Sequence, residues 1–246
     1  MTPDAPVYWY DEIDSTSDEA RRRAKAGEIG PLWIAAHQQS AGRGRLGRAW
    51  LSPPGNLFTT ALFIEPAGLK QAIRIPFAAG LAAHDACHGI MPKIEFELKW
   101  PNDLRVDRAK LCGILIESGE LNGSVWIAAG IGLNVSYAPK DTGQAVTCLA
   151  GLGAAAALMP EHVLDALRPA FAKRVAQART DFPGLLRDWL GVAEGVGQTV
   201  RAGPHDARIE GVFEGLAEDG GLVLRLPDGQ MRTIRAGDVE LVRHVD

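Results

Sequence analysis

The chain has 246 residues, with 26 Lys and Arg against 30 Asp and Glu, and therefore a formal charge of -4. This balance argues against a broad basic face for nucleic acid, so any anion site must be local. With 46% hydrophobic and 23% charged residues, the composition is that of a globular protein rather than a disordered one. The length predicts one large domain, or one domain with a small appendage.

The cysteines Cys87, Cys112 and Cys148 are widely spaced and form no C-x-x-C pair. The sequence therefore indicates neither a disulfide framework nor a thiolate zinc site. The N-terminus has no basic segment followed by an apolar one, and no apolar run reaches the roughly 18 residues that a membrane span needs. We therefore expect a cytoplasmic protein that has no membrane partner.

The first third of the chain predicts three strands and a helix. Residues 7–13 are rich in aromatic and β-branched side chains, and the spacing of Thr16 and Glu19 is that of a capping box that opens a helix over residues 19–27. Residues 31–38 and 56–65 are mostly apolar and predict two buried strands. The loop between them has about 17 residues, which is long for a compact domain and indicates function or disorder.

The middle of the chain predicts two helical regions around a set of strands. Residues 69–90 are rich in alanine and contain Pro76, so we expect a kinked or interrupted helix that packs on a sheet. Strands are expected over residues 94–100, 104–107, 110–118 and 125–135, and Asn122-Gly123 predicts a hairpin between the last two. Residues 161–190 are expected to be helical, with breaks at Pro169 and Pro183.

From about residue 196, short predicted strands alternate with turn clusters. This pattern is typical of a small antiparallel barrel. A unit of about 50 residues is rarely stable by itself, so we expect the barrel to dock on the larger domain. The expected domains are residues 1–195 and 196–246.

The long loop contains the segment GRGRLG at residues 42–47, which fits the G-x-G-x-x-G pattern. A dinucleotide site of that type requires a helix directly after the motif, but prolines and a glycine follow at residues 53–55. The glycines can instead let the backbone approach an anion, while Arg43, Arg45 and Arg48 offer guanidinium groups to carboxylate or phosphate. The alternative is a mobile, solvated basic loop.

A second polar cluster surrounds a predicted hairpin. One strand ends at Lys99, the chain turns through Pro101-Asn102-Asp103, and an apolar strand begins at Lys110, so both lysines and Asp103 can share one site. Taken separately, each lysine is typical of a surface charge at a strand end. Gly113 near Lys110 indicates that another group approaches the backbone there.

Two further segments have both structural and functional interpretations. Residues 15–17 (STS) lie where the first strand meets the first helix, and their hydroxyls can cap the helix and also contact a ligand. Residues 130–135 (GIGLNV) read as a strand thinned by glycine, which fits a pocket wall or close packing equally well. His37, His84 and His88 do not have the spacing of metal ligands.

Several segments, in this order, resemble the biotin protein ligases, also called biotin-[acetyl-CoA-carboxylase] ligases. They are residues 15–17 (STS), 39–50 (QSAGRGRLGRAW), 99–104 (KWPNDL), 110–117 (KLCGILIE) and 132–135 (GLNV). The resemblance extends over essentially the whole chain. It implies an α+β fold with the mixed sheet and helices of class II aminoacyl-tRNA synthetases and biotin/lipoate ligases, followed by a small C-terminal SH3-like β-barrel. Because the chain begins at the catalytic strand, we expect a ligase without the DNA-binding domain of some relatives.

The resemblance also implies a reaction in two steps. The carboxylate of biotin attacks the α-phosphate of MgATP to give biotinyl-AMP and pyrophosphate, and a lysine of a carrier protein then attacks the mixed anhydride. The implied ligands are biotin, ATP and Mg2+. The implied partner is the biotin carboxyl carrier protein, the biotinyl domain of acetyl-CoA carboxylase, and no nucleic acid is implied.

Roles for individual residues follow from the same resemblance. Lys110, Arg43 and Asp103 are implied in catalysis, with Asp103 as the candidate ligand of Mg2+. The implied biotin site consists of Ser15, Thr16, Ser17, Gln39, Arg43, Gly44, Arg45, Lys110 and Gly113. The implied nucleotide site consists of Arg43, Arg45, Trp50, Lys99, Asn102, Lys110 and Asn134. Position 17 is Ser where several relatives have Asn. The resemblance therefore implies a side-chain contact with biotin more strongly for Ser15 and Thr16 than for Ser17.

Two other functions are compatible with these residues. A lipoate or octanoate transferase has the same fold, but the polar groups of Ser15, Thr16 and Gln39 favour a ureido ring over a dithiolane. A non-catalytic anion-binding module, such as one for nucleic acid, would use the arginine loop and show salt-dependent binding without ATP turnover. The acidic net charge argues against that module.

Overall fold

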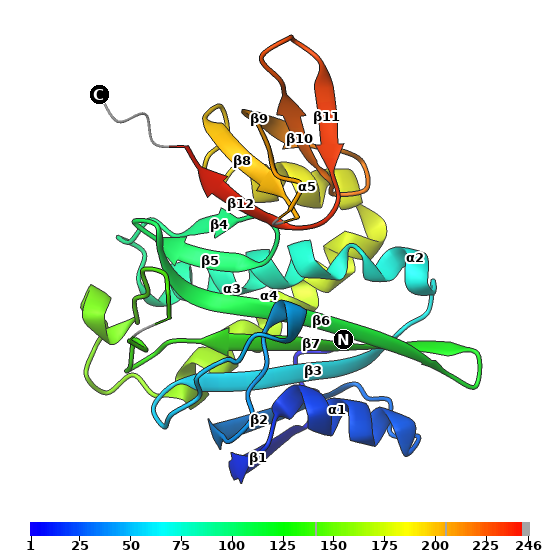
Figure 1. The fold of residues 1–246 in the computed structure, drawn as a ribbon. Helices are drawn as coiled ribbons and strands as arrows, with labels where there is room; N and C mark the ends of the chain where they lie inside the picture. Colours follow the sequence, from blue (N-terminus) through cyan, green and yellow to red (C-terminus); the bar gives the residue numbers. More distant parts are fainter. Residues whose placement is uncertain (141, 205, 243–246) are drawn as a thin grey trace.

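The computed structural model describes residues 1–140, 142–204 and 206–242, except for the side chain of Lys70. A seven-stranded mixed sheet forms the centre of the larger part, in the order β1-β2-β3-β7-β6-β5-β4 (Figure 1). Its strands are β1 (Val7–Ile13), β2 (Leu32–Gln39), β3 (Leu57–Glu65), β4 (Glu97–Lys99), β5 (Asp103–Val106), β6 (Ala109–Leu121) and β7 (Ser124–Leu133). The pair β1 and β2 is parallel, and the other neighbours are antiparallel.

Helices cover both faces of this sheet (Figure 1). In β2, Ile34 joins a small core with Ala20 and Ala24 of α1 (Thr16–Lys25), whereas Trp33 joins the main core with α3 (Ile75–Ile90) and α4 (Pro160–Thr180). Successive strand residues point to opposite faces, so α1 lies on one face and α3 and α4 lie on the other. The helical set is completed by α2 (Leu69–Ala72) and α5 (Phe182–Leu190).

The start of α1 differs from the expected one. β1 has the predicted bounds, but the helix begins at Thr16 and its N-cap is Ser15, whose Oγ accepts a bond from the backbone N of Asp18 at 3.4 Å. The hydroxyl of Thr16 is bonded to Thr60 at 2.9 Å and so does not cap the helix. The predicted capping box on Thr16 and Glu19 is therefore wrong by one residue.

The prolines of the helical regions act in different ways. Pro76 lies in the first turn of α3, after a gap that separates α2 from α3, so the predicted interrupted helix is confirmed. Pro183 likewise lies in the first turn of α5. The predicted break at Pro169 is wrong, because α4 continues through it. Burial of Leu167 and Phe171 against the sheet offsets the loss of about 3 kcal/mol that an interior proline causes.

The C-terminal residues form a second sheet, and the predicted small antiparallel unit is confirmed. Its five strands have the order β11-β10-β9-β8-β12, and all neighbours are antiparallel. They are β8 (Thr199–Gly203), β9 (Ile209–Leu216), β10 (Leu222–Arg225), β11 (Met231–Ile234) and β12 (Asp238–Leu241). The predicted last strand extends to residue 243, which lies outside the described residues.

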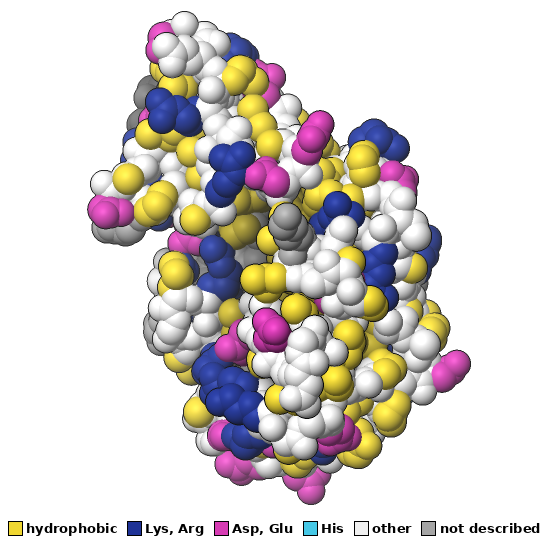
Figure 2. All heavy atoms as spheres, turned by 90° about the vertical axis from the view of Figure 1, so that its right-hand side faces the viewer, with side chains coloured by type: hydrophobic (Ala, Val, Ile, Leu, Met, Phe, Trp, Pro, Cys, Tyr) yellow, Lys and Arg dark blue, Asp and Glu magenta, His cyan; other side chains and the backbone are white. Residues whose placement is uncertain are grey.

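The second sheet docks on the first part of the chain, as expected for a unit of this size. Phe213 and Leu222 are buried in the same core as α3, and Trp100 Nε1 donates to the carbonyl of Gly220 at 3.1 Å. Figure 2 shows this sheet as an upper lobe, with Lys and Arg side chains interspersed among Asp and Glu on the face in view. In the view of Figure 1 the lobe is drawn above β4 and β5, which end the strand order of the larger sheet.

An ion pair ties α3 to α4 and provides a test of the packing. Arg174 Nε lies 2.7 Å from Asp85 Oδ2. Burial raises the pKa of Asp85, but hydrogen bonds from His84 and Arg174 outweigh it and lower the pKa from 3.8 to about 2. A carboxyl group whose pKa is lower in the folded state stabilises the protein at pH values above its unfolded-state pKa. This stabilisation is lost as the pH falls through the folded-state pKa.

We therefore expect Asp85→Asn to lower the free energy of unfolding at pH 7 by about 2 kcal/mol, and by less at pH 3. Urea unfolding at the two pH values measures both quantities. Asp165→Asn is the control, because Asp165 is 72% exposed in its pair with Arg168. Its expected change is below about 0.5 kcal/mol. An equal loss in the two variants would contradict the role of the buried pair.

Candidate functional site

One cavity of about 630 Å3 collects every site residue that the sequence predicted. Its floor is the sheet, and its walls come from the start of α1, from residues 39–51, from Pro139 and residues 142–146, and from β12. The predicted residues that line it are Ser15, Thr16, Ser17, Gln39, Arg43, Gly44, Arg45, Trp50, Lys99, Asn102, Asp103, Lys110, Gly113 and Asn134. The site is thus built from segments more than 100 positions apart in the chain.

One end of the cavity carries a chain of hydroxyl and amide groups. The backbone N of Thr16 donates to Gln39 Oε1 at 2.8 Å, because β2 runs parallel to β1 and ends beside the start of α1. Gln39 Nε2 in turn donates to Ser52 Oγ at 2.9 Å. Ser17 Oγ and Thr60 Oγ1 lie 3.3 Å apart and are buried. This end can therefore donate to and accept from a polar, uncharged ligand.

Thr60 and Ser52 are polar residues of this end that the sequence reasoning missed. Thr60 lies in the middle of β3 with no exposed surface, and its hydroxyl reaches Thr16 at 2.9 Å. The signal was the Thr59-Thr60 pair inside an otherwise apolar strand, since hydroxyls in a buried strand need partners. Ser52 had no such signal, because it belongs to the loop.

The opposite end of the cavity brings together Lys99, Asp103 and Lys110, as the hairpin predicted. Lys99 pairs with Asp103 in the register of β4 and β5, and Lys110 Nζ lies 2.7 Å from Asp103 Oδ1. Asp103 and Lys110 are only 12% and 13% exposed at the side chain, so Lys110 is not the strand-end surface charge of the alternative interpretation. The cluster can bind an anion through two ammonium groups.

A β-bulge turns Lys110 toward this cluster. Asp103 pairs with Gly113 and Leu104 with Cys112, but Arg105 then pairs with Lys110, so one residue of β6 is skipped. In a regular strand Lys110 and Gly113 would point to opposite faces, because side chains alternate. The extra residue reverses that alternation and places Lys110 on the face of Asp103. The backbone of Lys110 is also held by residues 145–147, to which it makes two hydrogen bonds of 2.9 Å.

The charge of Lys99 is affected by its surroundings. Burial lowers the pKa of Lys99, and the charge of Arg105 lowers it further, whereas Asp103, Glu194 and Asp238 raise it; the net shift is downward. An anion placed beside Lys99 would favour its charged form again. The lysine is therefore suited to a phosphate ligand, which compensates the cost of burying the ammonium group.

The arginine loop forms a short hairpin over the cavity instead of a solvated loop. Arg43 bridges to Ala49, Gly44 N donates to Arg48 O at 2.7 Å, and the tip is a 3-10 turn (Arg45–Gly47). The absence of a following helix agrees with the rejection of a dinucleotide motif. At the base, backbone bonds join residues 40 and 41 to Ile13 and Asp14.

The tip of this loop contacts the C-terminal sheet. Arg45 donates to Asn102 Oδ1 at 3.0 Å and to Gly237 O at 3.4 Å, and Arg48 donates to Asp238 Oδ2 at 2.7 Å. Burial lowers the pKa of Arg45. Burial raises the pKa of Asp238, but the hydrogen bond and charge of Arg48, with smaller effects of Arg45 and Lys99, outweigh this and lower it.

Trp50 lies flat against two paired glycines. Gly113 of β6 is opposite Gly132 of β7, and a Cβ atom would come within 2.8 Å of the Trp50 ring at Gly113 and 2.6 Å at Gly132. Lys110 Nζ lies 5.3 Å from the centroid of the same ring. The glycine-containing segment of β7 therefore lines the cavity and also lets the Trp50 ring pack closely against the backbone.

If Trp50 lies at the ATP site that the resemblance implies, we expect Gly132→Ala to displace Trp50 and to raise the KM for ATP about tenfold, which is about 1.4 kcal/mol. The reason is steric, since the methyl group would overlap the indole. Steady-state kinetics with varied ATP measures the effect. The control is Gly89→Ala on α3, where nothing lies within 4 Å of the added Cβ. An unchanged KM for ATP in Gly132→Ala would place Trp50 outside the ATP site that the resemblance implies.

Two walls of the cavity were not among the predicted site residues. Residues 139–146 contribute Pro139, Thr142, Gly143, Gln144 and Val146, and β12 contributes Asp238 and Glu240. No local pattern marks these residues as part of a site, because they reach it only through the tertiary fold. Asn134 is among the predicted residues, and its side-chain amide bonds Asn56 Nδ2 and Thr147 O, so it also holds the chain just after this wall.

Comparison with known proteins shows the family to which the chain belongs. Residues 12–134 match the Biotin/lipoate A/B protein ligase family, and residues 195–242 match the Biotin protein ligase C terminal domain. The chain is 38% identical to the biotin--[acetyl-CoA-carboxylase] ligase of Paracoccus denitrificans over 92% of this chain and 96% of that protein. Against the ligase of the same name from Mycobacterium tuberculosis the identity is 31%, over 93% and 86%.

A solved structure has the same fold. The biotin protein ligase of Aquifex aeolicus in complex with biotin and ATP superposes with a TM-score of 0.80 at 26% identity, over 97% of this chain and 99% of that one. The chain belongs to the biotin/lipoate A/B protein ligase family. The α+β fold class with a small SH3-like C-terminal unit is thereby confirmed. In the described part of the chain, no helix is long and apolar enough to span a membrane.

Proposed function

We propose that this protein is an ATP-dependent ligase that attaches biotin to a lysine of a carrier protein through biotinyl-AMP. The observation that carries this function is the polarity of the cavity. One end offers neutral hydrogen-bonding groups, the other offers ammonium groups, and the arginine loop covers the space between them. A ligand with a ureido ring and a carboxylate has the matching polarity.

Biotin lies in this cavity with its ureido ring toward the start of α1. Ser15, Thr16, Ser17 and Gln39 surround that ring, and the valeryl chain runs toward Lys110. Arg43, Gly44 and Arg45 cover the carboxylate from the loop. Thr60 supports the hydroxyls from below, since it bonds both Thr16 and Ser17.

ATP occupies the other end. Trp50 lies beside the adenine, while Lys99, Asn102 and Lys110 face the phosphates together with Arg43 and Arg45. Asn134 forms part of the same wall. A carboxylate oxygen of biotin attacks the α-phosphorus, the bond to the β-phosphate oxygen breaks, and pyrophosphate leaves. This step brings anions together, and two unit charges 4 Å apart repel by about 4 kcal/mol at an effective dielectric constant of 20.

Lys110 is the residue that counters this repulsion most directly. Its ammonium group is buried next to the cavity and oriented by Asp103, so it needs little reorganisation during the reaction. Arg43 and Asp103 complete the proposed catalytic set. The surroundings strengthen the effect because water is largely excluded.

A magnesium ion is part of the proposal, with Asp103 as its ligand. Lys110 Nζ lies 2.7 Å from Asp103 Oδ1, so in this proposal the ion would bind the second oxygen of the same carboxylate. The described residues contain no group of three or more metal-ligating side chains. This fits Mg2+, which usually takes one or two carboxylates plus phosphate oxygens and water. The ion would neutralise charge on the phosphates.

The second substrate in this proposal is the biotin carboxyl carrier protein of acetyl-CoA carboxylase. A lysine amine of the carrier attacks the carbonyl carbon of the anhydride, and AMP leaves. A cytoplasmic location belongs to the proposal as well, supported by three cysteines that are all free and buried. We also propose a domain boundary between residues 195 and 196, supported by the match of residues 195–242 to a separate C-terminal family.

The direct test is transfer of labelled biotin, with MgATP, to the lysine of a biotin carrier domain. We expect label on the carrier, release of pyrophosphate and AMP, and no transfer without ATP. Lipoate in parallel tests the rival substrate, which the hydroxyl chain around Thr16 disfavours. Transfer of lipoate in preference to biotin would overturn the assignment.

A further inference from the structure

The three arginines of the loop have different partners. Arg45 and Arg48 extend toward the C-terminal sheet, whereas Arg43 extends the other way, to two carboxylates. Its Nη1 lies 3.2 Å from Asp18 Oδ1, and its Nη2 donates to Glu117 Oε1. Asp18 belongs to α1 and Glu117 to β6, so a single side chain joins the loop to two elements of the larger part.

Glu117 has few other contacts. Its Oε1 accepts from Arg43, while Oε2 is buried and finds no hydrogen-bond partner in the residues that the structure describes. A buried carboxylate oxygen without a partner lowers stability. The carboxylate therefore contributes little to the stability of the sheet, and its interaction with Arg43 is the reason for a charge at this position.

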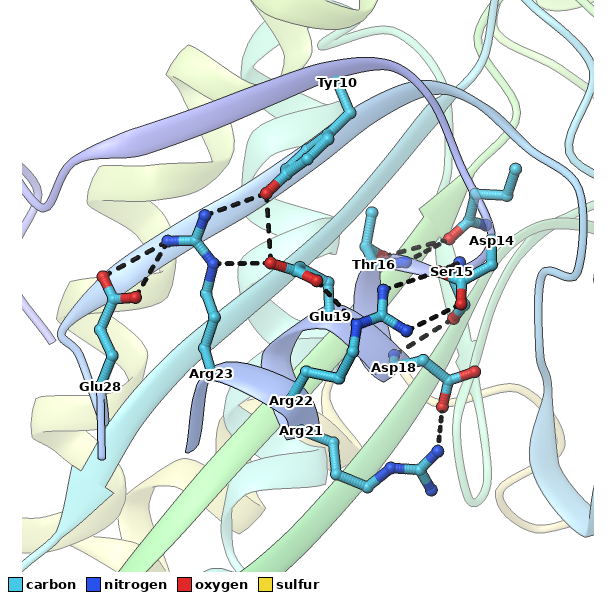
Figure 3. A network of polar contacts seen from close by, with 11 residues as sticks. Tyr10, Asp14, Ser15, Thr16, Asp18, Glu19, Arg21, Arg22, Arg23 and Glu28 are labelled. Atoms are coloured by element: carbon cyan, nitrogen blue, oxygen red, sulfur yellow. Dashed lines mark hydrogen bonds and ion pairs between the residues drawn. The ribbon is translucent and has the colours of Figure 1, made fainter. Parts of the chain in front are cut away.

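Asp18 is fixed by the same turn that forms one end of the cavity. Its backbone N donates to Ser15 Oγ, and its carboxylate also binds Arg21. Figure 3 shows that Asp18 and Glu19, although adjacent, bind different partners, since Glu19 accepts from Arg22, Arg23 and Tyr10. Of the two acidic neighbours, Asp18 alone contacts the loop among the described residues.

We propose that Asp18 and Glu117 are positioning residues that clamp Arg43 and so hold the middle of the loop over the cavity. The base of the loop is held by backbone bonds and the tip by Asp238, and the clamp secures the part between them. Because two carboxylates bind its guanidinium group, Arg43 tethers the loop in addition to facing the ligand. This rests on the proposed function, since the loop retains the reactive adenylate and excludes water.

The test compares Asp18→Asn with Glu19→Gln, because the two side chains are adjacent and are 16% and 17% exposed. Preformed biotinyl-AMP complex is chased with unlabelled adenylate, and its dissociation rate is recorded beside the single-turnover rate of adenylate formation. We expect Asp18→Asn and Glu117→Gln to raise dissociation about tenfold, with formation changed less than twofold. Glu19→Gln is expected to change neither rate.

A double-mutant cycle separates the clamp from a general effect on folding. If Asp18 acts through Arg43, Asp18→Asn has no further effect on dissociation in an Arg43→Ala background. Two results would overturn the proposal. One is a dissociation rate of Asp18→Asn equal to that of Glu19→Gln, and the other is an effect of Asp18→Asn that adds to the effect of Arg43→Ala. Failure of the wild-type protein to form an adenylate from biotin and ATP would instead refute the proposed function.

Discussion

Lys110→Ala is expected to reduce adenylate formation by two orders of magnitude or more, on the order of 3 kcal/mol. The bulge in β6 places its ammonium group against Asp103 and beside Trp50, where the carboxylate and the α-phosphate meet in the proposed complex. A preorganised charge in a water-poor site stabilises the developing negative charge more than a mobile one would. Removal of the Lys110 ammonium group therefore lowers the rate of adenylate formation, the first step.

Pyrophosphate release from ATP and biotin measures this effect. Lys110→Arg keeps the charge and is expected to retain more activity than Lys110→Ala, whereas Lys93→Ala, at an exposed position, is expected to match the wild type. Thermal unfolding of each variant checks the fold, since Asp103 loses its partner. Undiminished pyrophosphate release in a folded Lys110→Ala protein would remove Lys110 from the mechanism.

The second large effect is expected for Arg45→Gly, which should raise the dissociation rate of biotinyl-AMP about 100-fold. Arg45 joins the loop tip to Asn102 in the turn after β4 and to the carbonyl of Gly237. Two charged hydrogen bonds of about 1.5 kcal/mol each account for this factor. Glycine also adds conformational freedom to the tip.

A chase experiment with unlabelled adenylate measures the rate. Arg45→Lys keeps the charge without the forked donors and should give an intermediate rate. Arg225→Ala is the control, because Arg225 is 51% exposed and pairs with Glu214 within the C-terminal sheet. If Arg45→Gly released biotinyl-AMP as slowly as the wild type, the contacts of the loop tip would not be what closes the cavity.

Much of the fold was predictable because its signals are local. The aromatic and β-branched side chains of β1, the Asn122-Gly123 turn and the turn clusters after residue 196 all correspond to observed elements. The errors occur where tertiary contacts override local preference. Pro169 remains inside α4 because its neighbours are buried, and Thr16 gives up the capping role because its hydroxyl bonds Thr60.

The candidate site was predictable for the residues that form motifs and not for the others. The arginine loop and the KWPND hairpin carry unusual residue types at close spacing, so they are visible without a structure. Thr60, Glu117 and Asp238 are ordinary residues of strands or strand ends. Asp238 lines the cavity, and Thr60 and Glu117 contact residues that line it, only because Arg48, Thr16 and Arg43 reach them across the fold.

The sequence by itself determined that positive charge is concentrated locally in an acidic chain, at Arg43, Arg45, Arg48, Lys99 and Lys110. Only the tertiary structure decided how each charge is used. A bulge turns Lys110 into the cavity, and Asp238, 190 residues after Arg48, meets the tip of the loop. Sequence patterns report preferences over a few residues, whereas the register of a sheet and the docking of two sheets depend on burial summed over the whole chain.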